Sequence, residues 1–357
     1  MKAVVIVCLL VAGVACAELA EPSHPAGDRA EEKRIELDGV EPSLATEADM
    51  DRLNELVSAL SVPDPRFRLM LDLGWTTGRS SWEISFQEFE PGFGIVDVHS
   101  RLGWKRLESI IYRLHGEYKV NDWLRLSASV GLGSLDNGQN SDTDWYANFM
   151  GRDFIFSKSE ADTDGDVTLF NLNAHVRLNE FFELSRLPGQ WDVFGGYQYH
   201  EEDLRDRNGV QTIIDEEQVN MPFSGLNSTY LFEWQAARLG VRGEIPLADR
   251  LRLRGSLAGL WARFEGEGFW NLRDDFRNES PNFVQSASNG LGVELSLFGV
   301  FDITETFFAE IGWWQLYLKA QNGTDKLYFA DGFEARTDLE FARTQRQGVF
   351  IGFGGQF

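Results

Sequence analysis

The residues of this chain best suited to chemistry are two aspartates one residue apart, Asp142 and Asp144, which are followed directly by Trp145. On a β-strand, residues two apart point to the same face, so both carboxylates would point the same way, as shared binding of one water molecule requires. Two like charges held that close raise the pKa of one of the carboxyl groups. The pair is therefore the first candidate site of this sequence.

A second acidic group, residues 162–166, alternates carboxylates in the manner of a calcium-binding loop. In an EF-hand loop a glycine occupies the sixth position and a bidentate glutamate the twelfth. Here Gly165 is displaced and the twelfth position holds Asn173. We therefore expect no calcium site, and the sequence predicts neither a metal nor another cofactor.

Both cysteines, Cys8 and Cys16, lie in an N-terminal segment that has the features of an export signal. A basic start and an apolar run over residues 3–14 precede an Ala-Cys-Ala cleavage site, and the run is too short to span a bilayer as a helix. We predict that residues 1–17 are a signal peptide, whose removal leaves no cysteine for disulfides, thiol catalysis or zinc. A lipoprotein signal ending at Cys16 is the less favoured alternative, because Gly13 replaces the usual leucine.

The composition excludes several classes of protein. The 357 residues include 33 Lys and Arg against 56 Asp and Glu, a formal net charge of -23. A chain this acidic repels phosphate backbones, so we expect no nucleic-acid partner. Aromatic residues make up 13% of the chain, which is too many for a disordered acidic protein and indicates a folded body.

Residues 18–65 form an acidic segment that contains five prolines and one candidate helix. Thr46 and Asp49 make a start similar to a capping box. We predict an acidic periplasmic arm with one short helix, and leave open whether it is a linker, a partner-binding arm or a periplasmic plug. The apolar residues of the helix fall at helical spacing: Met50, Leu53, Leu56, Val57 and Leu60.

In the remainder of the chain the apolar residues recur at every second position. Leu69, Leu71 and Leu73 begin this pattern, and Trp75 ends the first run. The runs are long, and aromatic residues crowd their ends, which is typical of transmembrane barrels whose apolar side chains face lipid. The last run ends at Phe357 and resembles an outer-membrane assembly signal.

We therefore predict an all-β fold: a ten-stranded antiparallel transmembrane outer-membrane β-barrel over residues 66–357, preceded by the short helical arm. The long acidic loops at 135–165, 204–229, 266–282 and 322–344 would be extracellular. The predicted strands are residues 66–77, 97–118, 122–134, 166–178, 190–203, 230–246, 250–265, 283–301, 307–321 and 345–357.

Charged residues of both signs occupy the face of these strands that would point into the lumen. A ten-stranded lumen is filled by side chains, and mixed signs favour mutual ion pairing over a transport role. The predicted lumen residues are Arg68, Asp72, Arg113, His115, Glu117, Arg125, His175, Arg177, Arg238, Arg242, Glu244, Arg252, Arg254, Glu294 and Glu310.

Several segments of this predicted barrel resemble the omptin family of outer-membrane proteases. Omptins carry an Asp-x-Asp-Trp motif at the extracellular end of a strand, and residues 142–145 match it in type and spacing. The resemblance covers most of residues 66–357 and leaves out the arm. It rests on Ile110-Ile111, Leu132-Gly133, Ser141 to Trp145, Glu160 to Thr163, Leu169 to Asn173, Gly196 to Gln198, Gly259 to Trp261 and Ala309 to Trp313.

The resemblance implies that Asp142 and Asp144 hold the attacking water. In omptins an Asp-x-His pair across the groove completes the site, where the histidine takes a proton from the water and the aspartate orients the imidazole. The corresponding positions here hold Gly268 and Trp270, and no histidine follows His200. The chain therefore keeps only one half of the omptin site.

Glu265 and Glu267 are the possible substitutes for the missing half of the site. They would make an all-carboxylate site, in which an ordinary carboxylate is a weak base for water at neutral pH. If the chain is an enzyme, the resemblance makes it an omptin-type endopeptidase with an altered base.

The resemblance also implies partners for the barrel. Omptins bind lipopolysaccharide through outward Tyr, Glu and Arg residues, and here Tyr197 is kept while Tyr199 and Glu201 replace the acid–arginine pair. The lipid motif is thus incomplete. Omptins favour basic substrates, and acidic loops would attract cationic peptides or proteins on electrostatic grounds.

Three functions remain open from the sequence. The first is a surface endopeptidase that uses the Asp142 and Asp144 pair on basic peptides. The second is a non-catalytic omptin-like barrel that binds cationic ligands as an adhesin or binding protein. The third, less favoured, is a narrow porin. In each case we expect a monomer in the bacterial outer membrane.

Overall fold

The computed structural model describes residues 63–180 and 189–357 of the chain. The predicted signal peptide and the predicted helix of the arm lie outside the described residues and stay predictions. None of the helical segments within the described residues has the length and apolarity needed to cross a membrane.

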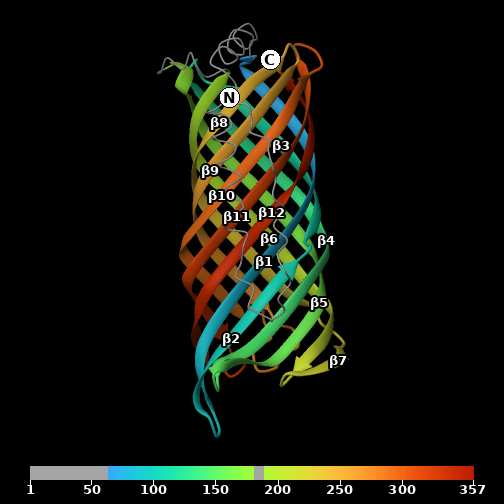
Figure 1. Cartoon of the computed structure of the whole chain (residues 1–357), viewed down its shortest axis with the longest axis vertical. Helices are drawn as coiled ribbons and strands as arrows, with labels where there is room; N and C mark the ends of the chain where they lie inside the picture. Colours follow the sequence, from blue (N-terminus) through green and yellow to red (C-terminus); the bar gives the residue numbers. More distant parts are fainter. Residues whose placement is uncertain (1–62, 181–188) are drawn as a thin grey trace, which may run out of the picture. The chain divides into compact units, whose positions relative to one another are not determined.

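The described residues form one closed antiparallel sheet, in which β12 pairs with β1 to complete the ring (Figure 1). A single 3-10 turn, Leu178–Glu180, follows β5. The strands are β1 (Phe67–Glu90), β2 (Gly94–Lys105), β3 (Glu108–Lys119), β4 (Leu124–Phe149), β5 (Arg152–Arg177), β6 (Gln190–Ile214), β7 (Glu217–Phe223), β8 (Ser228–Ala248), β9 (Leu251–Phe269), β10 (Phe283–Asp302), β11 (Phe307–Tyr328) and β12 (Glu334–Gln356).

The predicted all-β antiparallel barrel is confirmed, and its ring has ten strand positions, although the described residues divide into twelve separate strands. The first extra strand arises because β2 and β3 lie end to end between β1 and β4. They are separated at Arg106, which has a φ of 55°, and Leu107 exchanges two backbone hydrogen bonds with Gly78 at 3.0 Å. The second extra strand, β7, pairs only with β6.

The predicted long loops are also wrong over much of their length, because the strands continue through them. β4 runs to Phe149 and β5 begins at Arg152, where a loop over residues 135–165 was expected. In these extensions polar residues occupy both faces of the sheet, so the apolar period of two disappears from the sequence while the backbone pairing persists.

Apolar side chains on the outer face form a band around one half of the barrel's length. Inward neighbours alternate with them, as Met70 and Asp72 do with Leu69 and Leu71. Such a band is the surface that a barrel presents to lipid. Its exposed members include Leu69, Leu71, Trp75, Ile110, Tyr112, Leu114, Leu126, Val130, Leu132, Phe170, Leu172, Tyr197, Leu239, Val241, Trp261, Leu291, Val293, Leu297, Ile311, Val349, Ile351 and Phe353.

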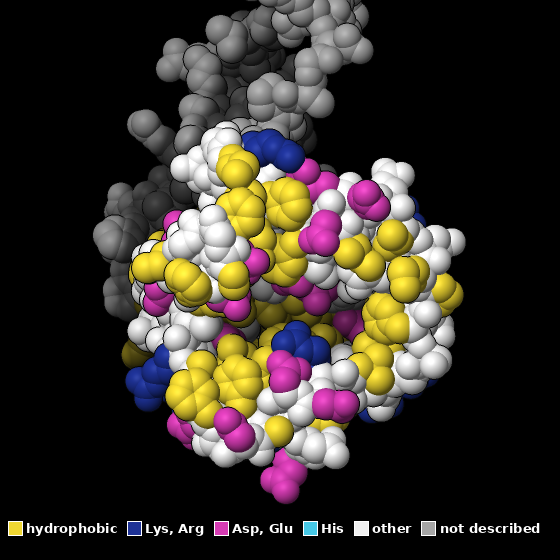
Figure 2. Space-filling model, turned by 90° about the horizontal axis from the view of Figure 1, so that it is seen from below, with side chains coloured by type: hydrophobic (Ala, Val, Ile, Leu, Met, Phe, Trp, Pro, Cys, Tyr) yellow, Lys and Arg dark blue, Asp and Glu magenta, His cyan; other side chains and the backbone are white. Residues whose placement is uncertain are grey.

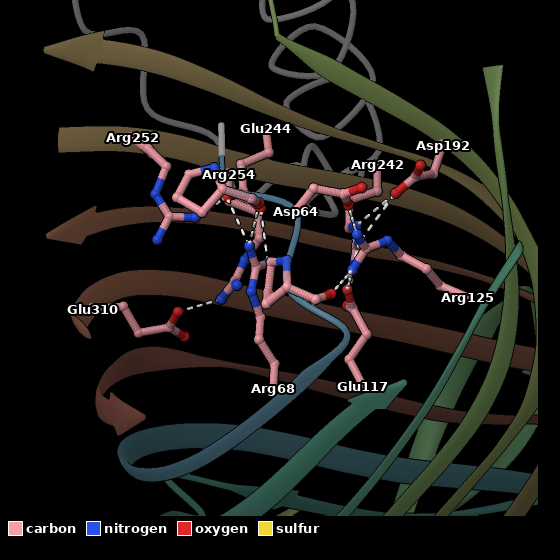
Figure 3. A network of polar contacts seen from close by, with 12 residues as sticks. Asp64, Arg68, Glu117, Arg125, Asp192, Arg242, Glu244, Arg252, Arg254 and Glu310 are labelled. Carbon is pink, nitrogen blue, oxygen red and sulfur yellow. Dashed lines mark hydrogen bonds and ion pairs between the residues drawn. The ribbon is translucent and has the colours of Figure 1, made fainter. Parts of the chain in front are cut away.

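The lumen inside the band holds the predicted network of ion pairs, which is confirmed (Figure 3). Arg242 bridges Glu117 at 2.5 Å and Asp192 at 2.9 Å. Asp64, which precedes β1, joins the network through Arg177 at 3.1 Å. The other pairs are Arg68 with Glu244, Arg113 with Asp72, Arg125 with Glu117 and Asp64, Arg177 with Asp192, Arg238 with Glu294, Arg252 with Glu244 and Asp302, and Arg254 with Glu310.

A second layer of side chains fills the lumen beyond this network. Arg346 of β12 pairs with Glu202 of β6 at 2.7 Å, and both side chains are 0% exposed. These two strands lie on opposite sides of the ring, so the pair crosses the lumen. Next to it, buried aromatic side chains pack together, among them Trp82, Trp104, Phe232, Trp234, Phe264 and Phe283.

Candidate functional site

The end of the barrel opposite Phe357, which carries β7 and the turn between β4 and β5, is here called the mouth (Figure 1). Figure 2 looks into this end, which is hollowed. Acidic and hydrophobic side chains surround the hollow, and a basic side chain lies within it. The predicted aspartate pair belongs to the inner wall of the mouth.

A β-bulge turns Asp142 and Asp144 into the lumen. Near the start of β4 the even-numbered residues face outward, and Leu132 is 58% exposed. The pairing with β5 shifts between Leu135 and Gly138, and beyond this point the even-numbered residues face inward, beginning with Asn140, which is 4% exposed. Without the bulge both carboxylates would point away from the mouth.

The two carboxylates have different surroundings. Asp144 accepts side-chain hydrogen bonds from Ser100 of β2 and Ser157 of β5, whereas Oδ1 of Asp142 is buried without a hydrogen-bond partner. Burial raises the pKa of both carboxyl groups, and the charge of Asp144 raises the pKa of Asp142 further. The pair therefore holds a proton at pH values where ordinary aspartates are ionised.

A third carboxylate, Asp206 of β6, lies in the same part of the mouth. It accepts hydrogen bonds from Nε1 of Trp104 at 3.0 Å and from Oγ1 of Thr163 at 2.6 Å. Burial raises its pKa to about 7, and its charge acts on Asp142. The sequence prediction missed this residue because it ended the strand at residue 203. Apart from Leu204, residues 201–207 are charged on both faces, so the sequence carries no period-two signal that extends the strand to Asp206.

The cation whose charge acts on both aspartates of the pair comes from the segment between β9 and β10. Arg273 donates to both oxygens of Asp275 at 2.9 and 2.8 Å and lies 4.7 Å over the ring of Phe276. Its positive charge lowers the pKa of Asp142 and Asp144, though less than burial raises it. A guanidinium stays protonated at all physiological pH values, so Arg273 is not a base for water.

Aromatic packing occupies the positions where an omptin has its Asp-x-His pair. Trp270 stacks on Phe283 with ring centroids 4.4 Å apart and contacts Phe276 at 5.1 Å. A Cβ on Gly268 would lie 2.1 Å from the Phe283 ring. These positions therefore contribute hydrophobic packing in place of a histidine and its aspartate.

The possible substitutes Glu265 and Glu267 do not face the aspartate pair. Along β9 the inward residues are even-numbered, such as Phe264 at 0% exposure, and both glutamates fall on the outer face. Glu265 forms an ion pair with Arg263 on that face. Because of this alternation, the prediction that either glutamate could replace the missing base is wrong.

The histidines of the described residues are engaged elsewhere. His99 pairs with Glu83 at 3.0 Å and stacks on Trp145 at 5.2 Å. Nε2 of His200 lies 3.3 Å from Glu202. The two others, His115 and His175, line a polar cavity of about 120 Å³ within the ion-pair network. Within residues 63–180 and 189–357, therefore, no histidine is placed to take a proton from a water on the aspartate pair.

Tyr197, the predicted lipid-binding residue, lies on the outer face and contacts the ring of Phe170 at 6.4 Å. Beyond it, the hydroxyl of Tyr199 donates to Glu201 and to Glu233, the latter at 3.2 Å. The outer wall is thus acidic next to Tyr197, which disfavours an anionic lipid headgroup at this position.

Comparison with a solved outer-membrane protease supports the barrel architecture. The outer membrane protease OmpT from Escherichia coli is 15% identical, with a TM-score of 0.67, and the match covers 84% of this chain and 100% of that one. The translocator domain of the autotransporter NalP from Neisseria meningitidis is 13% identical over 87% and 96% of the two chains, with a TM-score of 0.31. The toluene transporter TbuX from Ralstonia pickettii is 9% identical over 83% and 90%, also with a TM-score of 0.31.

At these identities the similarity to OmpT establishes the fold alone. Among curated protein sequences, none matches this chain. The sequence profile of a family described as Protochlamydia outer membrane protein matches residues 70–357, which is nearly the whole barrel. This chain is therefore an outer-membrane β-barrel that belongs to the Protochlamydia outer membrane protein family.

Proposed function

We propose that this barrel binds basic peptides or protein segments in its acidic mouth and does not cleave them, with the mouth facing the cell exterior. The observation that carries the proposal is the convergence of Asp142, Asp144 and Asp206 on one hollow. Within the described part of the chain, none of the three has an ion-pair partner within 4.0 Å.

The raised pKa values of these carboxyl groups explain why a cation would bind. Each group is costly to ionise where it lies, because burial removes it from water. A lysine or arginine side chain of a ligand would offset that cost and favour the ionised form. The net charge of -23 would also attract cationic ligands from solution.

The same geometry argues against proteolysis. A water molecule between Asp142 and Asp144 needs a nearby group that accepts its proton. Of the groups on other elements that act electrostatically with the pair, Arg273 stays protonated, and burial and the charges of Asp206 and Asp142 raise the pKa of Tyr230. Oδ1 of the remaining carboxylate, Asp206, already accepts hydrogen bonds from Trp104 and Thr163.

Buried side chains that fill the lumen argue against a narrow porin. The ion pair between Arg346 and Glu202 crosses it, and Ser80 and Thr344 are hydrogen-bonded to each other at 3.0 Å beside the pair. On the other side of this layer, Trp234 donates through Nε1 to Thr344 at 3.0 Å. Side chains buried to this extent fill the cross-section instead of lining a channel.

The proposal is tested with refolded barrel and a fluorescent peptide that contains paired arginines. We expect the wild type to bind this peptide and to leave it intact in mass spectra, and the D142N/D144N variant to bind it at least tenfold more weakly. The matched control is D164N, which removes one carboxylate that pairs with Arg207 at 3.1 Å on the outer wall. Cleavage that is lost in D142N would overturn the non-catalytic proposal.

A further inference from the structure

An aromatic side chain continues the inward row of the aspartate pair toward the rim of the mouth. Tyr146 follows Asp144 by two residues on β4, and it is opposite Val98 of β2. The side chain of Val98 is 2% exposed and belongs to the inner face. Opposed residues of a strand pair share one face of the sheet, so Tyr146 lies on the same inner face as Asp142 and Asp144.

Four phenylalanines form one cluster with Tyr146. The ring centroid of Tyr146 lies 4.6 Å from that of Phe156 and 6.1 Å from that of Phe154, both on β5. Phe149 lies 5.5 Å from Tyr146 and 4.8 Å from Phe93, which belongs to the turn between β1 and β2. We call Phe93, Tyr146, Phe149, Phe154 and Phe156 the aromatic lip.

The aromatic lip exposes apolar surface far from the band that meets lipid. Phe93 is 53% exposed, and Met150 in the turn between β4 and β5 is 80% exposed. Tyr146 follows Leu132 of the band by 14 residues on β4, which is roughly 45 Å along the strand. Figure 2 shows hydrophobic side chains around the hollow of the mouth. Exposed apolar surface that acyl chains cannot reach is typical of a binding surface.

Carboxylates flank the aromatic lip. The hydroxyl of Tyr146 donates to Glu90. Within residues 86–98, 145–158 and 211–217, which form the hairpin tips of the mouth, the carboxylates are Glu88, Glu90, Asp97, Asp153, Asp215, Glu216 and Glu217. The cations among the same residues are Arg152 and Lys158, and each is paired with a glutamate. The tips are therefore both apolar and anionic, so they repel anionic surfaces and fit an apolar partner that is also basic.

The spacing between the aspartate pair and the aromatic lip sets what a ligand must carry. Asp144 and Tyr146 are two residues apart on one face, which is about 7 Å along the strand. In an extended peptide, side chains two residues apart also point to one side at about this separation, whereas neighbouring side chains point to opposite sides. A basic residue bound to the aspartate pair therefore brings the side chain two positions away onto the aromatic lip.

We propose that the ligand of the mouth is an extended peptide segment that carries an aromatic side chain two residues from a basic one. The inference rests on the proposed function and adds a second subsite to it. The basic side chain pairs with Asp142 and Asp144, and the aromatic side chain packs on the aromatic lip. Offset or edge-to-face contacts between rings stabilise such packing beyond the effect of the buried area.

The test compares three fluorescent peptides of equal length on the refolded full-length barrel, each with one central arginine among serines. The first peptide has tryptophan two residues before and two residues after the arginine. The second has the same tryptophans directly beside the arginine, and the third has none. We expect the first peptide to bind roughly five- to tenfold more tightly than the second. Equal affinities of the first and second peptides would overturn the proposal.

Tyr146→Ser removes the ring two residues from Asp144, and Phe89→Ser is the matched control. Phe89 is opposite Ile95, and both side chains are exposed on the outer face of the β1–β2 hairpin. We expect Tyr146→Ser to lose the preference for the first peptide over the second and Phe89→Ser to keep it. A preference that survives in Tyr146→Ser, or is lost equally in both variants, contradicts the proposal. If Tyr146→Ser fails to refold, Phe93→Ser in the exposed turn makes the same comparison, with an expected twofold to threefold loss of preference.

The paired-arginine peptide separates a failure of this inference from a failure of the proposed function. If that peptide binds the wild type and not D142N/D144N, while the first and second peptides bind alike, the mouth binds cations and this inference alone fails. If the paired-arginine peptide does not bind the wild type, both fail. Binding of the barrel to neutral phosphatidylcholine vesicles that is lost in Phe93→Ser would assign the aromatic lip to a membrane surface and would also overturn the inference.

Discussion

Leu132 and Asp142 are both even-numbered residues of β4, yet Leu132 faces outward from the barrel and Asp142 faces its lumen. The cause is the bulge between Leu135 and Gly138, which inserts residues that have no partner on β5. Beyond the bulge, toward Asp142, the even-numbered residues of the strand face inward instead of outward. The acidic mouth therefore depends on a local irregularity of the backbone.

The bulge predicts a specific effect at Asn137, which has a φ of 57°. This left-handed conformation is accessible to asparagine and glycine but strained for β-branched residues. We expect Asn137→Val to lower the free energy of unfolding by about 1–2 kcal/mol and to weaken peptide binding. Asn137→Gly should keep the wild-type free energy of unfolding, measured by urea unfolding in micelles, and the wild-type affinity for the peptide. Equal behaviour of the two variants would show that the bulge does not set the strand's orientation.

The ion pair that crosses the lumen predicts a large loss of stability. Glu202→Gln leaves the Arg346 charge fully buried without a carboxylate, which costs about 3–5 kcal/mol in comparable buried pairs. Glu265→Gln removes a carboxylate from a solvent-exposed pair with Arg263 and should cost less than about 1 kcal/mol. Chemical unfolding of both variants measures the difference, and similar costs would contradict a structural role for the crossing pair.

The aromatic packing between β9 and β10 predicts that alanine is poorly tolerated at Gly268. Its Cβ would lie 2.1 Å from the ring of Phe283, which is buried, so we expect Gly268→Ala to cost about 1–3 kcal/mol. Gly259 on the same strand is the control, because the nearest atom to its Cβ would be 4.0 Å away. Thermal unfolding followed by gel mobility compares the two. A Gly268→Ala variant as stable as the wild type would contradict this prediction, because it would show that Phe283 can move and leave room for a larger side chain.

Asp206 predicts a pH-dependent effect on stability. Its pKa is raised to about 7 in the folded barrel, so the unfolded chain ionises first as the pH rises. The folded state therefore loses stability between the ordinary aspartate pKa and about pH 7, by about 4 kcal/mol in all. Asp206→Asn keeps an oxygen for Trp104 and Thr163 and removes the charge. We expect it to stabilise the barrel at pH 8 and to have little effect near pH 4. If Asp206→Asn increased the free energy of unfolding by the same amount at every pH, the raised pKa of Asp206 would be contradicted.

The barrel and its lumen network could be predicted from the sequence because the two faces of each strand differ in polarity inside the band. Arg68 and Asp72 alternate with Leu69 and Leu71, so the period of two identifies both the strand and its inward face. Beyond the band this contrast is lost. There both faces carry polar residues, so the periodicity of the sequence does not show that β4 and β6 continue. It therefore does not show that Asp206 of β6 lies near the aspartate pair.

The failure at Glu265 and Glu267 has the same physical origin. Their spacing from Gly268 suggested a carboxylate close to the omptin site, but a shift of one residue along a strand moves a side chain to the opposite face. The contribution of Arg273 could not be predicted either, because it lies in a connection between strands where no periodicity fixes its direction.

The central claim, a cation-binding acidic mouth, is tested most directly by calorimetric titration of a paired-arginine peptide into the refolded barrel near pH 7 in two buffers of different ionisation enthalpy. A bound cation lowers the raised pKa values of Asp142, Asp144 and Asp206, so the account predicts that binding releases protons and tightens as the pH rises. It also predicts that D142N/D144N loses most of both effects. Binding without proton release, or with unchanged affinity in that variant, would contradict the account.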